Sequence, residues 1–182
     1  GCPGEAANDD DATDDDDDAT DDAADDDDAA DDDDSSLPSS IDVTGPLTGP
    51  ALAKLCQDYE AVTVDGDVDI EGTAWTDLRA LACLRGVGGT LWLSTNAELT
   101  SLEGLEGLES IGGDLVVLLN HRLVSLTGLA LTGIGGSVQV ESNAALTSIA
   151  ALAGQEGAPG GDVLIARNAS LASLEGLDFG SI

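Results

Sequence analysis

The sequence has few basic residues, few aromatic residues and no methionine. Only 5 of its 182 residues are Lys or Arg, against 37 Asp or Glu, and the formal net charge at pH 7 is −32. Contacts to a nucleic-acid backbone need clustered Lys and Arg, so the composition argues against nucleic acid as a partner. An anionic membrane surface would repel the chain for the same reason.

Histidine and long apolar runs are also scarce. His121 is the single histidine, which leaves no His/Cys cluster, and we expect neither a metal site nor a cofactor. The sequence shows no nucleophile-elbow, P-loop or dinucleotide-binding motif, so we predict no catalytic residues and a non-enzymatic protein. The longest uncharged run, Leu123–Val140, is broken by four Gly, and no membrane span is expected.

Aspartate dominates the first part of the chain. Gly1–Asp34 contains 18 Asp and one Glu but no Lys or Arg, and so carries −19 of the total charge. Such a segment cannot bury apolar area, so residues 1–36 are predicted to be a disordered, extended tether. Weak calcium binding is the alternative, although no D-x-D-x-D-G loop is present. Residues 37–47, rich in Pro, Gly and Ser, are predicted to be a hinge.

A short capping helix is expected within residues 48–64. Thr48 is a candidate N-cap and Pro50 falls in the first turn, where a missing N–H costs little. Leu52 and Leu55 would face the following domain, with Ala51 alongside. Such a helix would close the first coil, as caps do in repeat proteins.

Residues 65–182 repeat with a period of 23 to 25. A period in this range is typical of a solenoid. Each repeat continues with a five-residue stretch whose second and fourth positions are apolar, which predicts a strand with one buried face. The repeats begin at Asp65-Gly66, Gly88-Gly89, Gly112-Gly113, Gly135-Gly136 and Gly160-Gly161, and the apolar pairs are Val68/Ile70, Leu91/Leu93, Leu115/Val117, Val138/Val140 and Val163/Ile165.

Asparagine and leucine recur in phase after each predicted strand. Stacked asparagines can satisfy backbone groups at an inner turn, coil upon coil, as in leucine-rich repeats. The leucine positions would then form ladders that point inward. The asparagines are Asn96, Asn120, Asn143 and Asn168, and the three ladders begin at Leu99, Leu102 and Leu105.

The combined pattern, L-x-S-L-x-G-L followed by I-G-G-D-L-x-V-x-x-N-x-x-L, resembles the receptor L-domain family and similar arrays in bacterial lipoproteins. The resemblance covers Leu55–Ile182 and is strongest over Gly88–Ile149. It implies an all-β dominated fold, a right-handed parallel β-helix of about five coils with a single strand per coil. The resemblance implies no catalytic site, and it does not predict which ligand the chain would bind. The first coil departs from the pattern, with Thr73 where Asn is expected.

The three cysteines separate into a pair and one other. Cys56 in the cap and Cys83 in the first coil are 27 residues apart, and a disulfide would join cap to coil. Two buried free thiols are the alternative. Cys2, which follows Gly and precedes a long polar tether, resembles the end of a bacterial lipobox. We expect its lipidation, with an incidental free cysteine as the alternative, and a leader already removed.

The outward face of the predicted sheet indicates a binding surface. Trp92, Val116 and Leu118 should adjoin there as an apolar patch rimmed by Asp and Glu, with Gln139 and Leu164 in the same row as Val116. The alternatives are that the hinge covers Trp92, or that these are isolated apolar residues without function.

The array ends at a repeat boundary without a polar cap, which predicts self-association through an open edge. Together these features suggest a lipid-anchored protein of the bacterial outer membrane or cell surface that binds a protein, peptide or glycan. A structural scaffold that joins through its last coil is the alternative.

Overall fold

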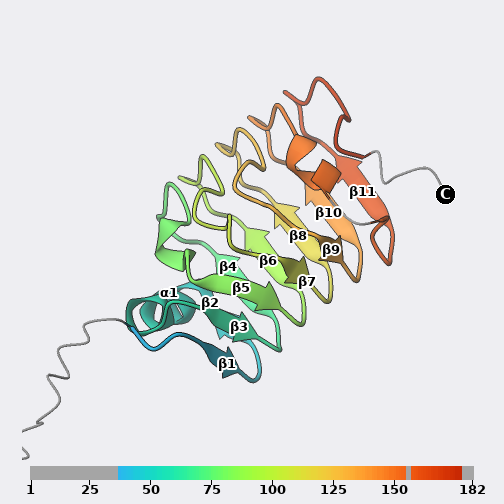
Figure 1. Cartoon of the computed structure of the whole chain (residues 1–182). Coiled ribbons are helices and arrows are strands. Elements are labelled where there is room, and N and C mark those ends of the chain that lie inside the picture. Colours follow the sequence, from blue (N-terminus) through green and yellow to red (C-terminus); the bar gives the residue numbers. More distant parts are fainter. Residues whose placement is uncertain (1–36, 155–156, 178–182) are drawn as a thin grey trace, which may run out of the picture. The chain divides into compact units, whose positions relative to one another are not determined.

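The computed structural model describes residues 37–154 and 157–177, which form two parallel β-sheets. From β1 to β10 the strands alternate between the sheets along the chain, and only β10 and β11 are both consecutive and hydrogen-bonded neighbours (Figure 1). The expected tether and Cys2 lie outside the described residues.

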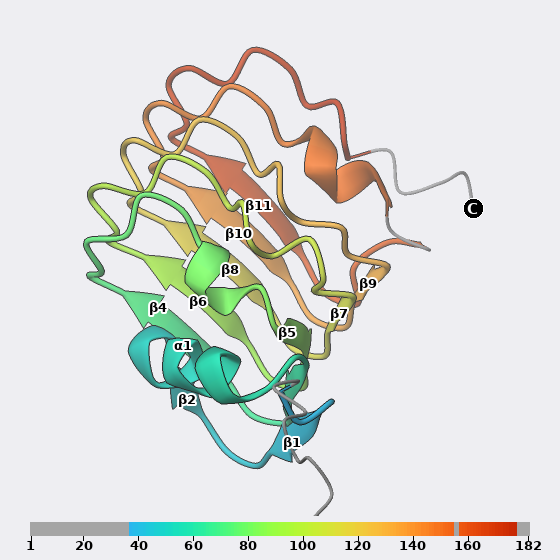
Figure 2. The ribbon, with the colours of Figure 1, turned by 60° about the vertical axis from the view of Figure 1, so that its left-hand side comes forward.

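One sheet has five short strands and the other has six. The first contains, in spatial order, β1 (Ile41–Val43), β3 (Val62–Val64), β5 (Leu84–Val87), β7 (Ser110–Ile111) and β9 (Gly133–Ile134). The second contains β2 (Leu47–Thr48), β4 (Val68–Glu71), β6 (Leu91–Ser94), β8 (Leu115–Leu118), β10 (Val138–Glu141) and β11 (Val163–Ala166). It runs along the whole stack in Figure 2.

The sheet register repeats the sequence period. Val68 pairs with Leu91, Leu91 with Leu115, Leu115 with Val138, and Val138 with Val163. Each step advances the chain by one sequence repeat, which is compatible with the predicted solenoid. The expectation of a single strand per coil is wrong, because the chain also pairs in the five-stranded sheet before every glycine turn up to Gly135-Gly136.

From β3 to β9, the five-stranded sheet is built on an apolar residue immediately before the turn that follows each strand. These residues face the interior and are at most 5% exposed, and each stacks on its counterpart in the neighbouring coil; they are Val64, Val87, Ile111 and Ile134. The strands are only two to four residues long, so no alternating pattern is available to predict them.

Leucine ladders fill the space between the sheets. Leu99, Leu123 and Leu146 are each 0% exposed, and the two following ladders are buried to a similar degree. Burying one such side chain contributes roughly 1.5–3 kcal/mol, so the repeated leucine is the main apolar contribution of each coil. In the last coil Leu174 is 60% exposed, because none of the described residues stack beyond it.

Close approach of successive coils explains the paired glycines. A Cβ on Gly88 would lie 2.6 Å from the carbonyl oxygen of Asp65 in the preceding coil. On Gly113 it would lie 2.7 Å from the carbonyl carbon of Gly89. The backbone N–H of Gly113 donates to the carbonyl oxygen of Gly89 over 2.9 Å, so the glycine column is itself a hydrogen-bonded ladder.

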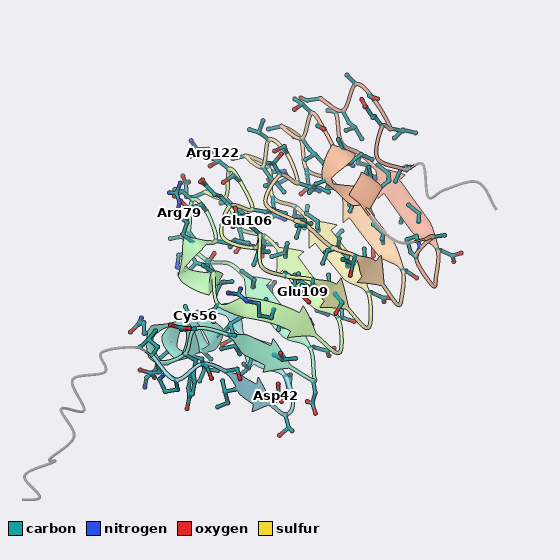
Figure 3. All side chains as sticks on the ribbon, viewed as in Figure 1. Asp42, Cys56, Arg79, Glu106, Glu109 and Arg122 are labelled. Carbon is teal, nitrogen blue, oxygen red and sulfur yellow. A yellow bond between two sulfur atoms is a disulfide. The ribbon has the colours of Figure 1, made fainter. Side chains whose placement is uncertain are left out.

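The chain enters the sheets earlier than predicted. Residues 37–47, expected as a hinge, contribute β1 and the first residue of β2, and Asp42 of β1 lies at the same end as Cys56 (Figure 3). The helix α1 (Gly49–Asp58) begins after Thr48 with Pro50 in its first turn, although the Thr48 side chain makes no capping hydrogen bond. Leu52 is buried, whereas Ala51 is exposed rather than packed. No helix in the described ranges is both long and apolar enough to span a bilayer.

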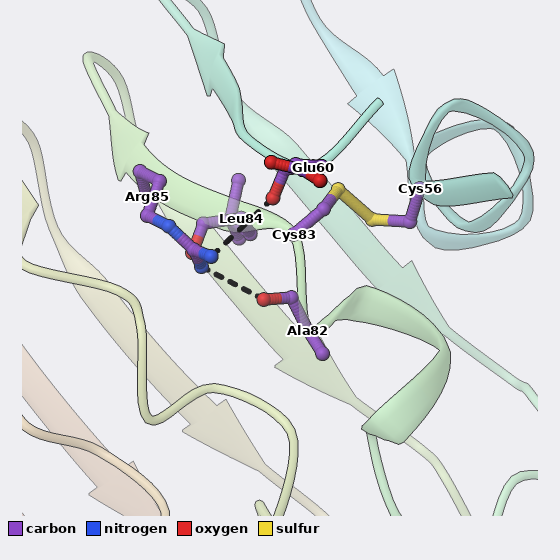
Figure 4. Close-up of a disulfide and its surroundings, with 6 residues drawn as sticks. All are labelled: Cys56, Glu60, Ala82, Cys83, Leu84 and Arg85. Atoms are coloured by element: carbon purple, nitrogen blue, oxygen red, sulfur yellow. Dashed lines mark hydrogen bonds between the residues drawn. A yellow bond between two sulfur atoms is a disulfide. The ribbon is translucent and has the colours of Figure 1, made fainter. Parts of the chain in front are cut away.

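A disulfide joins α1 to the turn immediately before β5. Cys56 and Cys83 are bonded, with their Cα atoms 5.2 Å apart, which confirms the predicted pair (Figure 4). Beside it, the guanidinium of Arg85 donates to the carbonyl oxygen of Ala82 over 2.7 Å and to that of Glu60 over 3.3 Å. These contacts fix the return of the chain from the cap into the sheets.

Candidate functional site

The asparagines form a continuous ladder beside the six-stranded sheet. The Oδ1 of Asn120 accepts the backbone N–H of Asn96 over 3.0 Å, and the Oδ1 of Asn143 accepts that of Asn120 over 2.9 Å. The Nδ2 of Asn120 also donates to the carbonyl oxygen of Leu93 over 2.8 Å. Asn96, Asn120 and Asn143 are fully buried, so each amide satisfies two backbone groups that water cannot reach. Asn168 continues the ladder at its half-buried end.

Thr73 starts this ladder in the first coil. Both its backbone N–H and its hydroxyl donate to the Oδ1 of Asn96, over 2.9 and 2.8 Å. Thr73 does not need to hydrogen-bond to a preceding coil. A hydroxyl that donates only to the next coil is therefore sufficient at this position. The departure from the sequence pattern therefore marks the beginning of the ladder.

A second ladder uses the row of alternating acidic and hydroxyl residues before each long strand. The carboxylate of Asp67 accepts the backbone N–H of Thr90 over 2.7 Å, and that of Asp114 accepts the N–H of Ser137 over 2.6 Å. The Ser137 hydroxyl accepts the N–H of Asp162 over 3.1 Å. The alternation keeps the carboxylates two strands apart, which relieves their repulsion. It also hydrogen-bonds each coil to the next.

The outward face of the six-stranded sheet holds the residues expected to bind. Asp69, Trp92, Val116, Gln139 and Leu164 are successive register partners across β4, β6, β8, β10 and β11. Trp92 is 40% exposed, so the described chain does not cover it.

Val116 does not contribute to an exposed patch. It is 3% exposed and lies outside the main core cluster, between the register partners Trp92 and Gln139. The longer side chains around it on the outer face account for its burial. The expectation that Val116 is available for contact is therefore wrong, and its role is to support its neighbours.

Sequence analysis missed Leu119, which lies just beyond the end of β8. Leu119 is 42% exposed and has a φ of +56°, a left-handed conformation that costs a non-glycine residue roughly 1–2 kcal/mol. The same corner is occupied by Gly72, Thr95, Ser142 and Arg167 in the other coils. A large apolar side chain held exposed on a strained corner suggests a contact residue. Its equivalence to Ser142 in the repeat was the available sequence clue.

These residues enclose a pocket of about 350 Å³ on the outer face. Trp92, Leu118 and Leu119 form its apolar wall, and Asp69 and Glu71 form its acidic wall. Ser94 and Thr95 also line it. Gln139 and Leu164 are not among its lining residues, so only Trp92 and Leu118 of the predicted set belong to it.

Two further spaces adjoin this pocket, one on each side. A space of about 360 Å³ beside it is lined by Thr48, Pro50 and the same two carboxylates. Beyond Leu119, a smaller space of about 210 Å³ reaches Glu141 and Arg167. A shallow groove therefore crosses the strands, acidic at the β2 end and closed at the other by the Arg167–Glu141 ion pair of 2.7 Å.

The carboxylates of Asp69 and Glu71, which form the acidic wall, are two negative charges close to each other. Burial raises the pKa of the Asp69 carboxyl, and the neighbouring Glu71 carboxylate raises it further. The hydroxyl of Thr95 is 3.4 Å from Glu71, a long hydrogen bond that neutralises little of this charge. A positive group placed here would remove this repulsion.

The other ion pairs lie on the turns away from this groove. Arg79 pairs with Glu103 over 2.6 Å, which raises the pKa of the guanidinium, and Arg122 pairs with Glu98 in the preceding coil. Arg79 and Arg122 lie together along one side of the stack (Figure 3). His121 is exposed, and no cluster of three or more metal-ligating side chains occurs in the described ranges.

Comparison of the chain with family models, curated proteins and solved structures gave no match.

Proposed function

We propose that the protein is a non-enzymatic, lipid-anchored binding protein of the bacterial cell surface or outer membrane. In this proposal the two sheets are a right-handed solenoid of about five coils, of the receptor L-domain type, capped by α1. The solenoid presents the outer face of its six-stranded sheet to a protein, peptide or glycan ligand, and the acidic tether holds it away from the membrane.

The observation that carries the binding role is the pocket beside Trp92. An indole that is 40% exposed and a leucine that is 42% exposed stand together on one face, next to two carboxylates. Exposed tryptophan is enriched at the centres of binding sites, where it contributes large contact area with little loss of side-chain entropy. The left-handed corner recurs in every coil, but only in this coil does it carry a large apolar side chain, and its exposure favours a role in contact.

Arrays of peptides and glycans, probed with the full chain, test this role. We expect specific ligands whose binding falls at least tenfold in Trp92→Gln and Leu119→Ser. Each variant introduces the residue that another coil carries at the same position, Gln139 and Ser142, so the fold tolerates it. Ligands that bind both variants as well as they bind the unaltered chain would disprove this site.

The anchor is tested on the native precursor expressed in a bacterium. Palmitate labelling and a mass increase at Cys2 are the expected results. An unmodified Cys2 would remove the anchor from the proposal but leave the binding face in place.

A second candidate function is assembly through the last described coil. Val163 and Leu174 are 37% and 60% exposed there, whereas their counterparts Leu91 and Leu102 are fully buried. Sedimentation velocity should show association that increases with concentration and is abolished by Leu174→Asp. A single monomeric species at all concentrations would refute it.

A further inference from the structure

We propose that the pocket beside Trp92 binds the guanidinium group of an arginine side chain presented by a protein or peptide partner. This inference rests on the proposed function, because it specifies the partner chemistry of the same face.

Charge complementarity is the first argument. Asp69 and Glu71 are both exposed in the acidic wall, and none of the basic side chains in the described ranges forms an ion pair with them. Three of the five basic residues are already paired with other carboxylates, and a fourth donates to backbone carbonyls. These are, in order, Arg79, Arg122 and Arg167, then Arg85.

The apolar wall beside the carboxylates selects an organic cation. The ring of Trp92 attracts a cation placed over its face, and tryptophan is the best aromatic residue for this contact. Leu118 and Leu119 provide apolar surface on which the methylene stem of a long basic side chain can pack while its charged end reaches the carboxylates. A pocket with both walls therefore matches a side chain with an apolar stem and a charged head.

A guanidinium fits this arrangement better than an ammonium. It is planar and can stack on the indole, and its fork of N–H donors can reach carboxylates in pairs. It is also more weakly hydrated than an ammonium, so its transfer into a half-open pocket costs less. Asp69 and Glu71, two residues apart on one strand face, offer two acceptors to one fork.

A metal ion is a poorer occupant. Calcium takes six to eight oxygen ligands, whereas this wall contributes two carboxylates, and no group of three metal-ligating side chains occurs in the described part of the chain. The apolar indole of Trp92, the register neighbour of Asp69, would also occupy space that a hydrated cation needs for water.

The groove is long enough to hold the partner's residues on either side of the arginine. Its pockets span the strands from β2 to β11, five steps of about 4.8 Å each. That length equals about seven residues of extended polypeptide. The arginine would lie near the β4 end, because the other end already holds Arg167.

The test uses a blocked heptapeptide with one central arginine among alanine, serine and glycine. Its controls carry citrulline, which has the same shape without the charge, or lysine. Binding to the full-length chain is followed by NMR at the two tryptophan indole N–H groups. Trp75, half-buried against α1, is the internal control, and only the Trp92 signal should shift.

Charge-removing variants locate the site. We expect the Asp69→Asn/Glu71→Gln double variant to weaken arginine-peptide binding about tenfold or more, as expected for the loss of charge-assisted hydrogen bonds. Glu71→Gln alone should also weaken binding of the arginine peptide. Its matched control is Glu109→Gln, which removes one charge next to β7 of the other sheet (Figure 3). It should change the affinity less than twofold. Unchanged thermal unfolding would show that each variant is folded.

Several results would overturn the inference. These are equal binding of the arginine and citrulline peptides, equal losses in Glu71→Gln and Glu109→Gln, a shift at Trp75 instead of Trp92, and no binding of the arginine peptide. The ligands found on the peptide and glycan arrays show whether only the arginine inference has failed or the proposed binding function has failed as well. If Trp92→Gln abolishes their binding while the arginine peptide does not bind, the face is a binding site for another chemistry.

Discussion

Asn120→Ala tests whether the asparagine ladder holds the coils together. The substitution leaves the buried N–H of Asn96 without its acceptor and the carbonyl oxygen of Leu93 without its donor. An unsatisfied buried polar group costs roughly 1–3 kcal/mol, so two of them should lower the free energy of unfolding by about 3–4 kcal/mol. This is a large share of the 5–15 kcal/mol that is typical of a domain.

Urea unfolding, followed by circular dichroism, measures the effect. The midpoint should fall in Asn120→Ala with little change in the denaturant slope. His121→Ala, an exposed neighbour, should be within about 0.5 kcal/mol of the unaltered chain. Asn168→Ala, at the half-buried end of the ladder, should cost about 1 kcal/mol because water can replace its bonds.

Asn120→Asp distinguishes the contribution of the side-chain acceptor from that of the side-chain donor. It keeps an oxygen for the Asn96 N–H but faces the carbonyl oxygen of Leu93 with a second acceptor. Burial raises the pKa of such a carboxyl in the folded state, so the variant should regain stability as the pH falls and the acid becomes a donor. A cost below about 1 kcal/mol in Asn120→Ala, or no gain at low pH in Asn120→Asp, would refute the reasoning.

Three further tests address other parts of the structure. Leu119→Asn should raise the free energy of unfolding by about 0.5–1 kcal/mol, because Asn tolerates the left-handed corner, and lower stability on urea unfolding would contradict the assigned strain. Replacing Cys56 and Cys83 with Ala should cost about 3–4 kcal/mol by loop closure, and an unchanged melting temperature would show that the bond contributes nothing. Gly113→Ala should destabilise by more than 2 kcal/mol because its Cβ would lie 2.7 Å from the preceding coil. Gly133→Ala, with nothing within 4 Å, is its control, and equal losses would disprove the close-approach argument.

The sequence by itself determined the parts that repeat in phase. Alternation over five residues is enough to identify an exposed and a buried strand face, so the rows of Trp92 and Leu118 could be read without coordinates. The buried asparagines were predictable because their spacing equals that of the strands. The cysteine pair followed from the position of Cys56 in the cap and of Cys83 in the first coil.

The tertiary structure decided features that depend on neighbouring coils. The second sheet uses strands too short to carry a pattern and forms only because Val87 and Ile111 stack between coils. The burial of Val116 follows from the lengths of side chains on adjacent strands, which alternation does not encode. Leu119 was missed because its exposure depends on backbone conformation at the corner. Local periodicity fixes which way a side chain points, whereas contacts 23 to 25 residues apart fix what surrounds it.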